Sequence, residues 1–280
     1  MKFGIDRLLE HSRLRRSLQG RRVALLAHPA AVTDDLTHSL DALAELPDIR
    51  LTAAFGPQHG LRGDKQDNMV ESADYSDPEL NIPVFSLYGE VRRPTAAMMD
   101  SFDVLLVDLQ DLGCRIYTFM TTLRYVLEAA AQFNKRVIVL DRPNPAGRPV
   151  EGLTLRPGWE SFVGAGPLPM RHGLTLGELG RWFIRELGLD LDYRVIGMQG
   201  WRPGLSPGYG WPLPWLNHPW WFEWRVIRMV GPGLRLQRVR YANPHVAPIE
   251  ALRSCCLLDR PPDRPRQNHS VASVAQDSIG

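Results

Sequence analysis

The sequence has 280 residues, 44% of them hydrophobic and 23% charged, which is ordinary for a globular protein with room for one large or two ordinary domains. A formal net charge of +2, without a basic patch that aromatic residues interrupt, argues against a nucleic acid partner. No window approaches about 18 uninterrupted apolar residues and residues 1–10 lack the apolar core of a signal peptide, so we expect neither a membrane span nor export.

Apolar runs of strand-like composition alternate with helical patterns along the first two thirds of the chain. In chain order, the predicted elements are a helix at 3–19, a strand at 22–27, a helix from Thr33 to Glu45, strands at 51–55 and 83–87, a short helix opened by Pro94, a strand at 102–107, a helix at 117–133, a strand at 136–140 and a helix that begins after Thr175 and ends near Leu187. The strand at 102–107 is almost wholly apolar, as in a strand buried on both faces. This order predicts an α/β fold with an open, mostly parallel sheet and helices on both faces.

A polar cluster follows each of five strand-like runs directly. The runs are Val23–Ala27, Leu51–Phe55, Pro83–Leu87, Phe102–Val107 and Val137–Leu140. In an open parallel sheet the carboxyl ends of the strands lie on one edge, and ligands bind in the crevice there. We therefore expect these clusters, which are far apart in sequence, to converge on one site.

The segment at 56–64, with the sequence GPQHGLRGD, is the most specific of these clusters. Its glycines allow the backbone to approach a ligand closely, while Gln58, His59, Arg62 and Asp64 supply hydrogen-bonding groups and a proton shuttle. The alternative is a turn-rich loop with solvated charges. A histidine between a buried strand and a glycine is badly placed for core packing, which favours the functional interpretation.

Two further strand ends carry charged residues. Asp108 closes one strand and should point into the crevice, Asp111 either caps the next helix or acts in the site, and Arg115 and Tyr117 follow. At the second strand end lie three candidates, Asp141, Arg142 and Asn144, held by two prolines, with Glu151 a little downstream. An internal Asp–Arg pair that braces the loop is the alternative there.

The other candidates lie after Leu87 and before the last predicted helix. Tyr88 could stack on a sugar ring, and Glu90 is a carboxylate that could equally be solvated. Arg171 and His172 precede a capping-box pattern at Thr175 and Glu178, and a helix N-terminus of this kind favours anions. A plain loop is the alternative.

Several common site signatures are missing from the sequence. There is no G-x-G-x-x-G after the first strand, no Walker loop, no G-x-S-x-G elbow and no H-E-x-x-H, so we expect no cofactor and no identifiable metal site. The three cysteines do not form a disulfide framework, which suits a reducing compartment, and we expect a cytoplasmic protein.

Five segments in order resemble the NamZ-type exo-β-N-acetylmuramidases: GPQHGLRGDKQ, PVFSLYGEVRRPT, DVLLVDLQDLGCRIYTF, VLDRPNPAGRPVEG and PMRHGLTLGEL. The resemblance covers about residues 3–216. It implies a Rossmann-like catalytic domain, which we place at 1–195, and a smaller C-terminal domain. It also implies release of terminal N-acetylmuramic acid from the non-reducing end of peptidoglycan fragments.

For such a glycosidase, two carboxylates should flank the scissile bond. The catalytic candidates are His59, Asp64, Asp108, Asp111 and Asp141, with Glu71 and Glu90 as further carboxylates. The substrate-binding candidates are Gln58, Arg62, Tyr88, Arg115, Tyr117, Arg142, Asn144, Glu151, Arg171 and His172. The lactyl carboxylate of the sugar would need a cation, for which Arg62 or Arg171 is the first choice.

The sequence departs from the family pattern in two places. Many relatives have Glu where Gln58 stands, and an amide cannot act as an acid, so another carboxylate would be needed. After residue 217 the sequence becomes Arg-rich and loses the family pattern, so we expect an incomplete C-terminal domain at 196–280 with an out-of-frame or disordered tail from about 218. Two rival hypotheses stay open: a non-catalytic muropeptide-binding protein, and a metal-dependent hydrolase of an anionic substrate that uses His59, Asp108 and Asp141.

Overall fold

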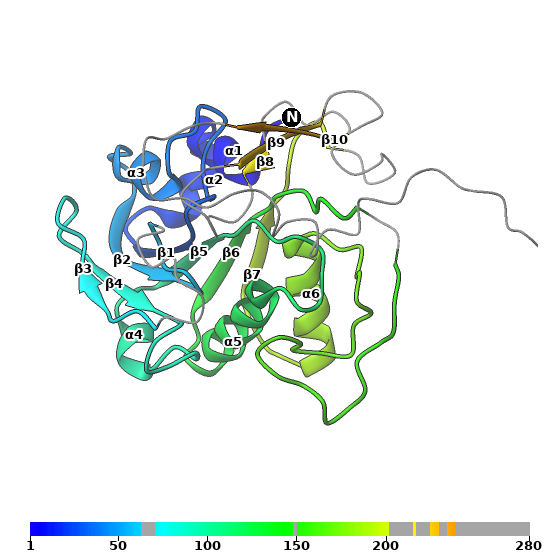
Figure 1. Ribbon diagram of the computed structural model, residues 1–280. Coiled ribbons are helices and arrows are strands. Elements are labelled where there is room, and N and C mark those ends of the chain that lie inside the picture. The colour runs from blue at the N-terminus through cyan, green and yellow to red at the C-terminus, as the bar shows by residue number, and fades with distance from the viewer. Residues whose placement is uncertain (63–70, 148–149, 202–214, 217–224, 230–233, 239–280) are drawn as a thin grey trace, which may run out of the picture. The chain divides into compact units, whose positions relative to one another are not determined.

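The protein folds around an open seven-stranded sheet with helices on both faces, which confirms the predicted α/β class (Figure 1). The computed structural model describes residues 1–62, 71–147, 150–201, 215–216, 225–229 and 234–238. The strand order is β3-β4-β2-β1-β5-β6-β7, and every neighbouring pair except β3 with β4 is parallel.

The helices are α1 (Gly4–Glu10), α2 (Ser12–Arg15), a 3-10 turn (Arg16–Leu18), α3 (Ser39–Ala44), α4 (Ala96–Asp100), α5 (Thr118–Gln132) and α6 (Leu176–Leu187). The strands of the seven-stranded sheet are β1 (Arg22–Ala27), β2 (Arg50–Gly56), β3 (Tyr75–Ser76), β4 (Pro83–Ser86), β5 (Val104–Asp108), β6 (Arg136–Leu140) and β7 (Tyr193–Ile196). A separate antiparallel sheet contains β8 (Trp215–Leu216), β9 (Arg225–Met229) and β10 (Leu234–Arg238).

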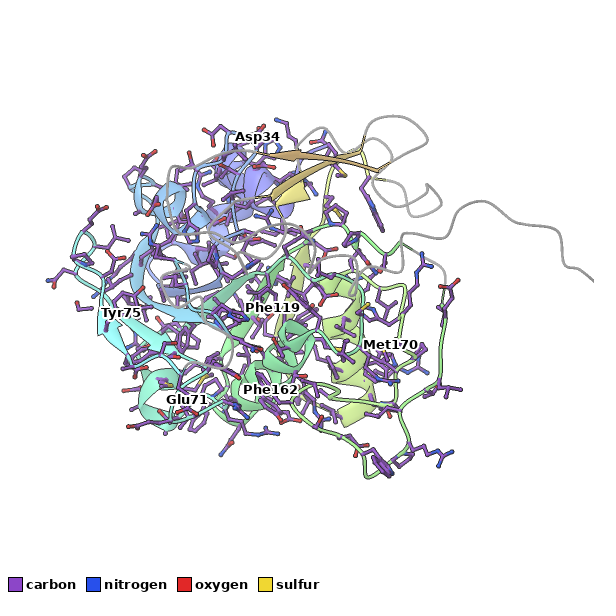
Figure 2. All side chains as sticks on the ribbon, viewed as in Figure 1. Asp34, Glu71, Tyr75, Phe119, Phe162 and Met170 are labelled. Atoms are coloured by element: carbon purple, nitrogen blue, oxygen red, sulfur yellow. The ribbon has the colours of Figure 1, made fainter. Side chains whose placement is uncertain are left out.

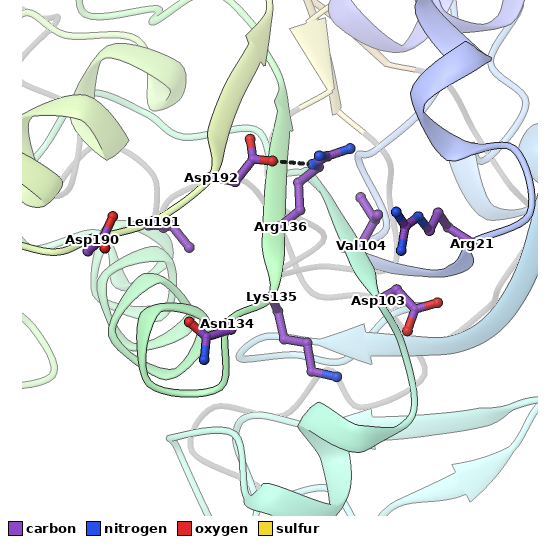
Figure 3. A pocket seen from close by; sticks show the side chains of 9 residues that line it. All are labelled: Arg21, Asp103, Val104, Asn134, Lys135, Arg136, Asp190, Leu191 and Asp192. Carbon is purple, nitrogen blue, oxygen red and sulfur yellow. Dashed lines mark hydrogen bonds and ion pairs between the residues drawn. The ribbon is translucent and has the colours of Figure 1, made fainter.

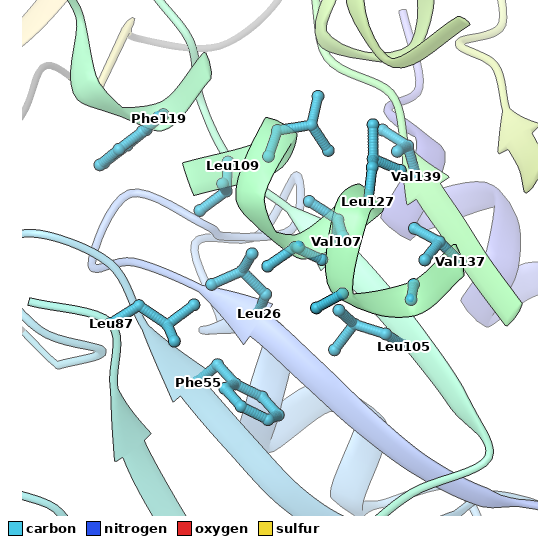
Figure 4. Close-up of a cluster of buried hydrophobic side chains, with 14 of the residues drawn as sticks. Leu26, Phe55, Leu87, Leu105, Val107, Leu109, Phe119, Leu127, Val137 and Val139 are labelled. Atoms are coloured by element: carbon cyan, nitrogen blue, oxygen red, sulfur yellow. The ribbon is translucent and has the colours of Figure 1, made fainter. Parts of the chain in front are cut away.

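Side chains of the central strands alternate between two hydrophobic cores, one on each face of the sheet. In β1, Ala24 and Leu26 pack with the residues of α4, α5 and α6, whereas Val23 and Leu25 pack with those of α1 and α3. The alternation follows from the two-residue period of a strand. Figure 4 shows the first core, in which side chains from β1, β2, β5 and β6 meet α5.

The strand register sets one level for the carboxyl ends of the central strands. Ala27 pairs with Asp108, and Gly56 pairs with Ser86. The chain moves outward from β1 through β2 to β4 on one side and from β5 through β6 to β7 on the other. The order therefore reverses between β1 and β5, which is where an open α/β sheet forms its binding crevice.

The helix predicted from Thr33 begins six residues later, at Ser39. Thr33 and Asp35 accept hydrogen bonds from the backbone N–H of Thr37, both at 3.1 Å, and these local bonds hold a turn in place of a helix. The N-cap is His38, whose side chain accepts from Leu40 N. His38 is only partly exposed at this position.

Three features of the structure were not expected from the sequence. The helix predicted at 3–19 is divided at His11 into α1, α2 and the 3-10 turn, and the short strands β3 and β7 were not anticipated. Within the stretch predicted to be out of frame or disordered, β9 and β10 pair as antiparallel strands. In the part of the chain that is described, no helix is long and apolar enough to cross a membrane.

Replacing Leu26 with Ala tests the core on the α5 face. Leu26 is completely buried in the central strand, so Leu26→Ala should lower the free energy of unfolding by about 2–5 kcal/mol. The matched control is Leu153→Ala, at a side chain that is 85% exposed, which should change it by less than about 0.5 kcal/mol. Equal effects in a urea titration would contradict this description of the core.

Candidate functional site

His28 and Gln110 lie where the strand order reverses, directly after β1 and β5. The backbone N–H of Gln110 donates to Nε2 of His28 at 2.9 Å, and the backbone N–H of Ala30 lies 3.4 Å from its Nδ1. The Gln110 side chain donates to the carbonyl oxygens of Asp111 and Pro143 at 2.9 and 3.0 Å. Neither residue was among the site residues predicted from the sequence. His28 directly follows β1 and Gln110 lies two residues after β5, so both meet the criterion that identified the predicted site residues, a polar side chain after a buried strand.

A buried ion pair between Asp108 and Arg142 joins the ends of β5 and β6. Nε and Nη2 of Arg142 lie 2.6 and 2.9 Å from the two carboxylate oxygens, and Ser39 also donates to Oδ2. Nη2 donates in addition to the carbonyl oxygen of Val32 at 2.7 Å. Both side chains are almost completely buried. The structure thus has an internal Asp–Arg brace, but the aspartate comes from β5 and not from Asp141.

Asp141 caps the N-terminus of α6. Its Oδ1 accepts from the N–H of Gly177 and its Oδ2 from the hydroxyl of Thr175, both at 2.8 Å. Thr175 and Glu178 form the predicted capping box. Burial raises the pKa of Asp141 to about 6, although the hydrogen bonds from Gly177 and Thr175 oppose this shift. Both oxygens are therefore occupied by structural contacts.

Asn144 and Arg115 tie the loops of this edge together. Asn144 donates to the carbonyl oxygen of Leu174 at 3.0 Å, and its side chain fills the space beside Gly113, where a Cβ would come within 2.1 Å of it. Nη1 of Arg115 donates to the carbonyl oxygens of Leu153 and Leu168, at 2.6 and 2.5 Å. Both side chains thus make contacts that fix the backbone.

Arg171 and Glu151 pair close to the surface. The distance from Nη1 of Arg171 to Oε2 of Glu151 is 2.7 Å, and Nη2 donates to the carbonyl oxygen of Ala146. Glu151 is exposed and Arg171 is only partly covered. An exposed pair of this kind contributes little to stability, so a ligand carboxylate could replace Glu151 at low cost.

His59 lies in a tight turn at the end of β2, beside Gln58. The turn is closed by a hydrogen bond of 2.9 Å from Gly60 N to Pro57 O, and the φ of His59 is +74°. This left-handed conformation is uncommon for residues other than glycine and is concentrated at functional sites. His59 is buried, and burial lowers the pKa of its imidazole, which is therefore mainly neutral at pH 7.

Arg62 is engaged by carboxylates of the protein itself. Its Nη1 and Nη2 donate to the two oxygens of Asp41 in α3 at 2.7 and 2.6 Å, and Nη2 lies 3.4 Å from Asp77. Asp64 lies outside the described residues, so its prediction stays untested.

Tyr88 is buried after β4, beside an aromatic group and a cation. Its ring centroid lies 5.7 Å from that of Phe162, and the guanidinium of Arg92 lies over the Tyr88 ring at 4.9 Å (Figure 2 labels Phe162). Glu71 and Glu90 are exposed. The tyrosine thus packs within the protein, and a sugar-stacking role would require Phe162 or Arg92 to move.

Asp111 and His172 form a second buried polar group at this edge, together with the partly buried Tyr117. Nε2 of His172 lies 3.5 Å from Oδ2 of Asp111, which also accepts from Gly113 N at 2.7 Å. Tyr117 as a whole is only partly buried, but the burial of its phenol, together with the Asp111 charge, raises the pKa of this group well above its usual value. Phe119, which Figure 2 labels, connects the two parts of the edge. Its ring lies edge-on to both His28 and Tyr117.

A pocket at the opposite edge of the sheet has a different character. It is formed by the amino-terminal ends of β5 and β6 and by residues 190–192 (Figure 3). Its lining contains three basic residues, Arg21, Lys135 and Arg136, and three aspartates, Asp103, Asp190 and Asp192. Arg136 pairs with Asp192 at 2.6 Å. Because ligands of open α/β folds bind at the carboxyl ends of the strands, we assign the functional site to the His28–Gln110 edge.

The predicted convergence of the polar clusters is thus seen for the strand ends of β1, β2, β5 and β6 and for the segment that contains His172. Within the described residues, no three His, Cys, Asp or Glu side chains are grouped to hold a metal ion. Asp108 and Asp141, which the metal-dependent hypothesis uses, have their oxygens in the contacts above. The fold is that of an open α/β protein with buried polar side chains gathered at its strand-order reversal.

Comparison with known proteins identifies the family. Residues 23–219 match the family described as the N-terminal part of the exo-β-N-acetylmuramidase NamZ, and the chain belongs to this family, as its motifs predicted. A peptidoglycan β-N-acetylmuramidase NamZ of Bacillus subtilis is 44% identical over 203 residues, which are 72% of this chain and 48% of that protein.

Two crystal structures of DUF1343 family proteins from Bacteroides fragilis share the fold. They are 38% and 30% identical, have TM-scores of 0.67 and 0.62, and each match covers 73% of this chain and 52% or 53% of the other. The chain therefore spans about half the length of the relatives it matches.

Breaking the buried ion pair should destabilise the protein strongly. Asp108→Ala leaves the Arg142 charge buried without its partner, so the free energy of unfolding should fall by about 3–5 kcal/mol. Asp192→Ala, which removes the partly exposed pair with Arg136, should cost about 1 kcal/mol or less. Similar losses for both variants in denaturant titrations would argue against a structural role for Asp108.

The raised pKa of Asp141 should make stability depend on pH. The folded protein binds the Asp141 proton more tightly than the unfolded chain does. Proton binding therefore stabilises the folded state fully below about pH 4, and this stabilisation is lost as the pH rises to about 6. This loss is about 3 kcal/mol of unfolding free energy. Asp141→Asn keeps an acceptor for Gly177 and can donate to Thr175, so it should remove this decline. Parallel stability curves for the two proteins would contradict the assignment.

Proposed function

We propose that this chain carries the substrate site of a glycoside hydrolase that releases terminal N-acetylmuramic acid from the non-reducing end of peptidoglycan fragments. Membership of the NamZ family over residues 23–219 carries the proposal. The 44% identity to the Bacillus subtilis enzyme supports the substrate class. We further propose that the protein acts in the cytoplasm, in the recycling of cell-wall fragments.

Arg171 is the candidate for binding the lactyl carboxylate of the sugar. The other arginines of this edge, Arg115 and Arg142, are buried among backbone oxygens or paired internally. Arg171 is partly exposed, and its present partner is the exposed Glu151. A bidentate guanidinium–carboxylate contact would supply charge and orientation for an anionic sugar. Arg62, which Asp41 already engages, is the second choice.

His59 is the candidate for proton transfer. Its neutral imidazole can accept or donate a proton near neutral pH, and the strained turn fixes its position at the end of β2. Gln58 beside it cannot donate a proton as an acid. A carboxylate must therefore come from elsewhere, and Asp64 and Asp111 remain as candidates.

Removing the His59 imidazole should slow turnover. On a disaccharide with terminal N-acetylmuramic acid, His59→Ala should lower kcat by about 100-fold or more, because general acid–base groups typically contribute this much. His11→Ala, at an exposed histidine before α2, is the matched control and should not change kcat. An unchanged rate in His59→Ala would remove this residue from the mechanism, and release of no N-acetylmuramic acid by the wild type would overturn the proposed hydrolysis.

A non-catalytic muropeptide-binding protein is the second candidate, and Gln58 favours it. If the resemblance correctly implies a catalytic Glu at this position, Gln58→Glu should raise the rate of hydrolysis by at least about 10-fold over the wild type. Gln58→Ala is the control for a merely altered turn. Tight binding of the disaccharide without turnover in the wild type, together with turnover in Gln58→Glu, would establish the binding function.

A further inference from the structure

The carboxylates of the strand-end edge differ in how many of their oxygens the protein uses. Asp108 has both oxygens on Arg142 and one also on Ser39, and Asp141 has one on Thr175 and one on Gly177. At Asp111, Oδ2 accepts from Gly113 N, whereas Oδ1 is buried and no described residue donates to it. A buried oxygen without a partner is costly, so such atoms call for an explanation.

His172 supplies the complementary atom. Its Nδ1 accepts from Leu174 N at 3.2 Å, so the hydrogen of a neutral ring is on Nε2. Nε2 lies 3.5 Å from Oδ2 of Asp111, which is too long for a good hydrogen bond, and it has no acceptor in the described part of the chain. A buried donor and a buried acceptor thus lie next to each other, and both are unfilled.

One chemical group satisfies both atoms at once. A hydroxyl group accepts a hydrogen bond through its oxygen and donates one through its hydrogen, whereas a carboxylate would be repelled by Asp111 and an ammonium would leave Nε2 without an acceptor. The pair is close to the surface, because its neighbours Leu112, Cys114 and Tyr117 are only partly buried. Asn144 and Gly113 pack against one another beside it.

We propose that Asp111 and His172 form a specificity subsite that binds one hydroxyl group of the sugar substrate, with Nε2–H of His172 donating to the hydroxyl oxygen and Oδ1 of Asp111 accepting its hydrogen. The inference rests on the proposed function, which supplies a sugar as the ligand. It assigns Asp111 to recognition of the sugar, and His172 to the same hydroxyl and not to the lactyl carboxylate.

The test compares the binding of methyl N-acetylmuramide with analogues that each lack one free ring hydroxyl, measured by titration calorimetry. The wild type should bind one analogue, the one that lacks the hydroxyl held by the pair, about 10- to 100-fold more weakly than the parent sugar. In that complex Oδ1 of Asp111 is left without a hydrogen-bond donor. Asp111→Asn keeps an acceptor for Gly113 N–H but presents a donor at the second position. His172→Asn keeps an acceptor for Leu174 and removes Nε2–H. In both variants, the parent sugar and that one analogue should bind with similar affinity. For the other analogues, the affinity relative to the parent sugar should be the same as in the wild type.

The control and the outcomes separate the subsite from the proposed function. The control is Asp141→Asn. Asp141 lies at the same edge and both of its oxygens already accept hydrogen bonds, so this variant should discriminate between the analogues as the wild type does. If Asp111→Asn and His172→Asn both discriminate between the parent sugar and this analogue as strongly as the wild type does, the proposed subsite is overturned. A buried water would then be the partner of the two atoms. If one variant fails to fold by circular dichroism, the other decides. Absence of any binding of the parent sugar to the wild type would overturn the proposed substrate, and the subsite with it, whereas binding without turnover would overturn only the hydrolysis.

Discussion

The arrangement of the binding edge depends on the buried ion pair between Asp108 and Arg142. It joins the ends of β5 and β6, and through Ser39 and Val32 it also fixes the segment that follows β1. Taking both charges out of water costs several kcal/mol per ion, and only good geometry offsets this cost. The two short contacts from Arg142 and the further hydrogen bonds supply that geometry. The arrangement of this edge therefore depends on a contact between residues 34 apart in sequence.

Most polar side chains of this edge hold the backbone, and this explains which groups are left for a ligand. Asp141 caps α6, Asn144 holds the loop after β6, and Arg115 binds carbonyl oxygens of the segment at 153–168. Arg171 is instead paired with Glu151 close to the surface, and Asp111 and His172 have one oxygen and one nitrogen without a partner among the described residues. A guanidinium beside hydrogen-bonding groups of this kind suits a polar, anionic ligand.

The sequence predicts the parts of this fold that depend on local patterns. Apolar runs and the capping box at Thr175 and Glu178 correctly give the strands β1, β2, β4, β5 and β6 and the start of α6. Convergence of the strand ends follows from parallel topology alone. The helix predicted to begin at Thr33 exists but starts later, because the side chains of Thr33 and Asp35 bind Thr37 N–H instead of capping a helix. The sequence does not predict which carboxylates have structural roles, because their partners are distant in sequence. Asp108 pairs with Arg142, and Asp141 accepts from Gly177 N.

A crystal structure of the chain with N-acetylmuramic acid bound tests the central claim most directly. The account predicts the sugar at the carboxyl ends of β1 and β5, beside His28 and Gln110, with its lactyl carboxylate toward Arg171. A sugar bound in the pocket of Arg136 and Asp192 at the opposite edge of the sheet, or outside this crevice altogether, would contradict it.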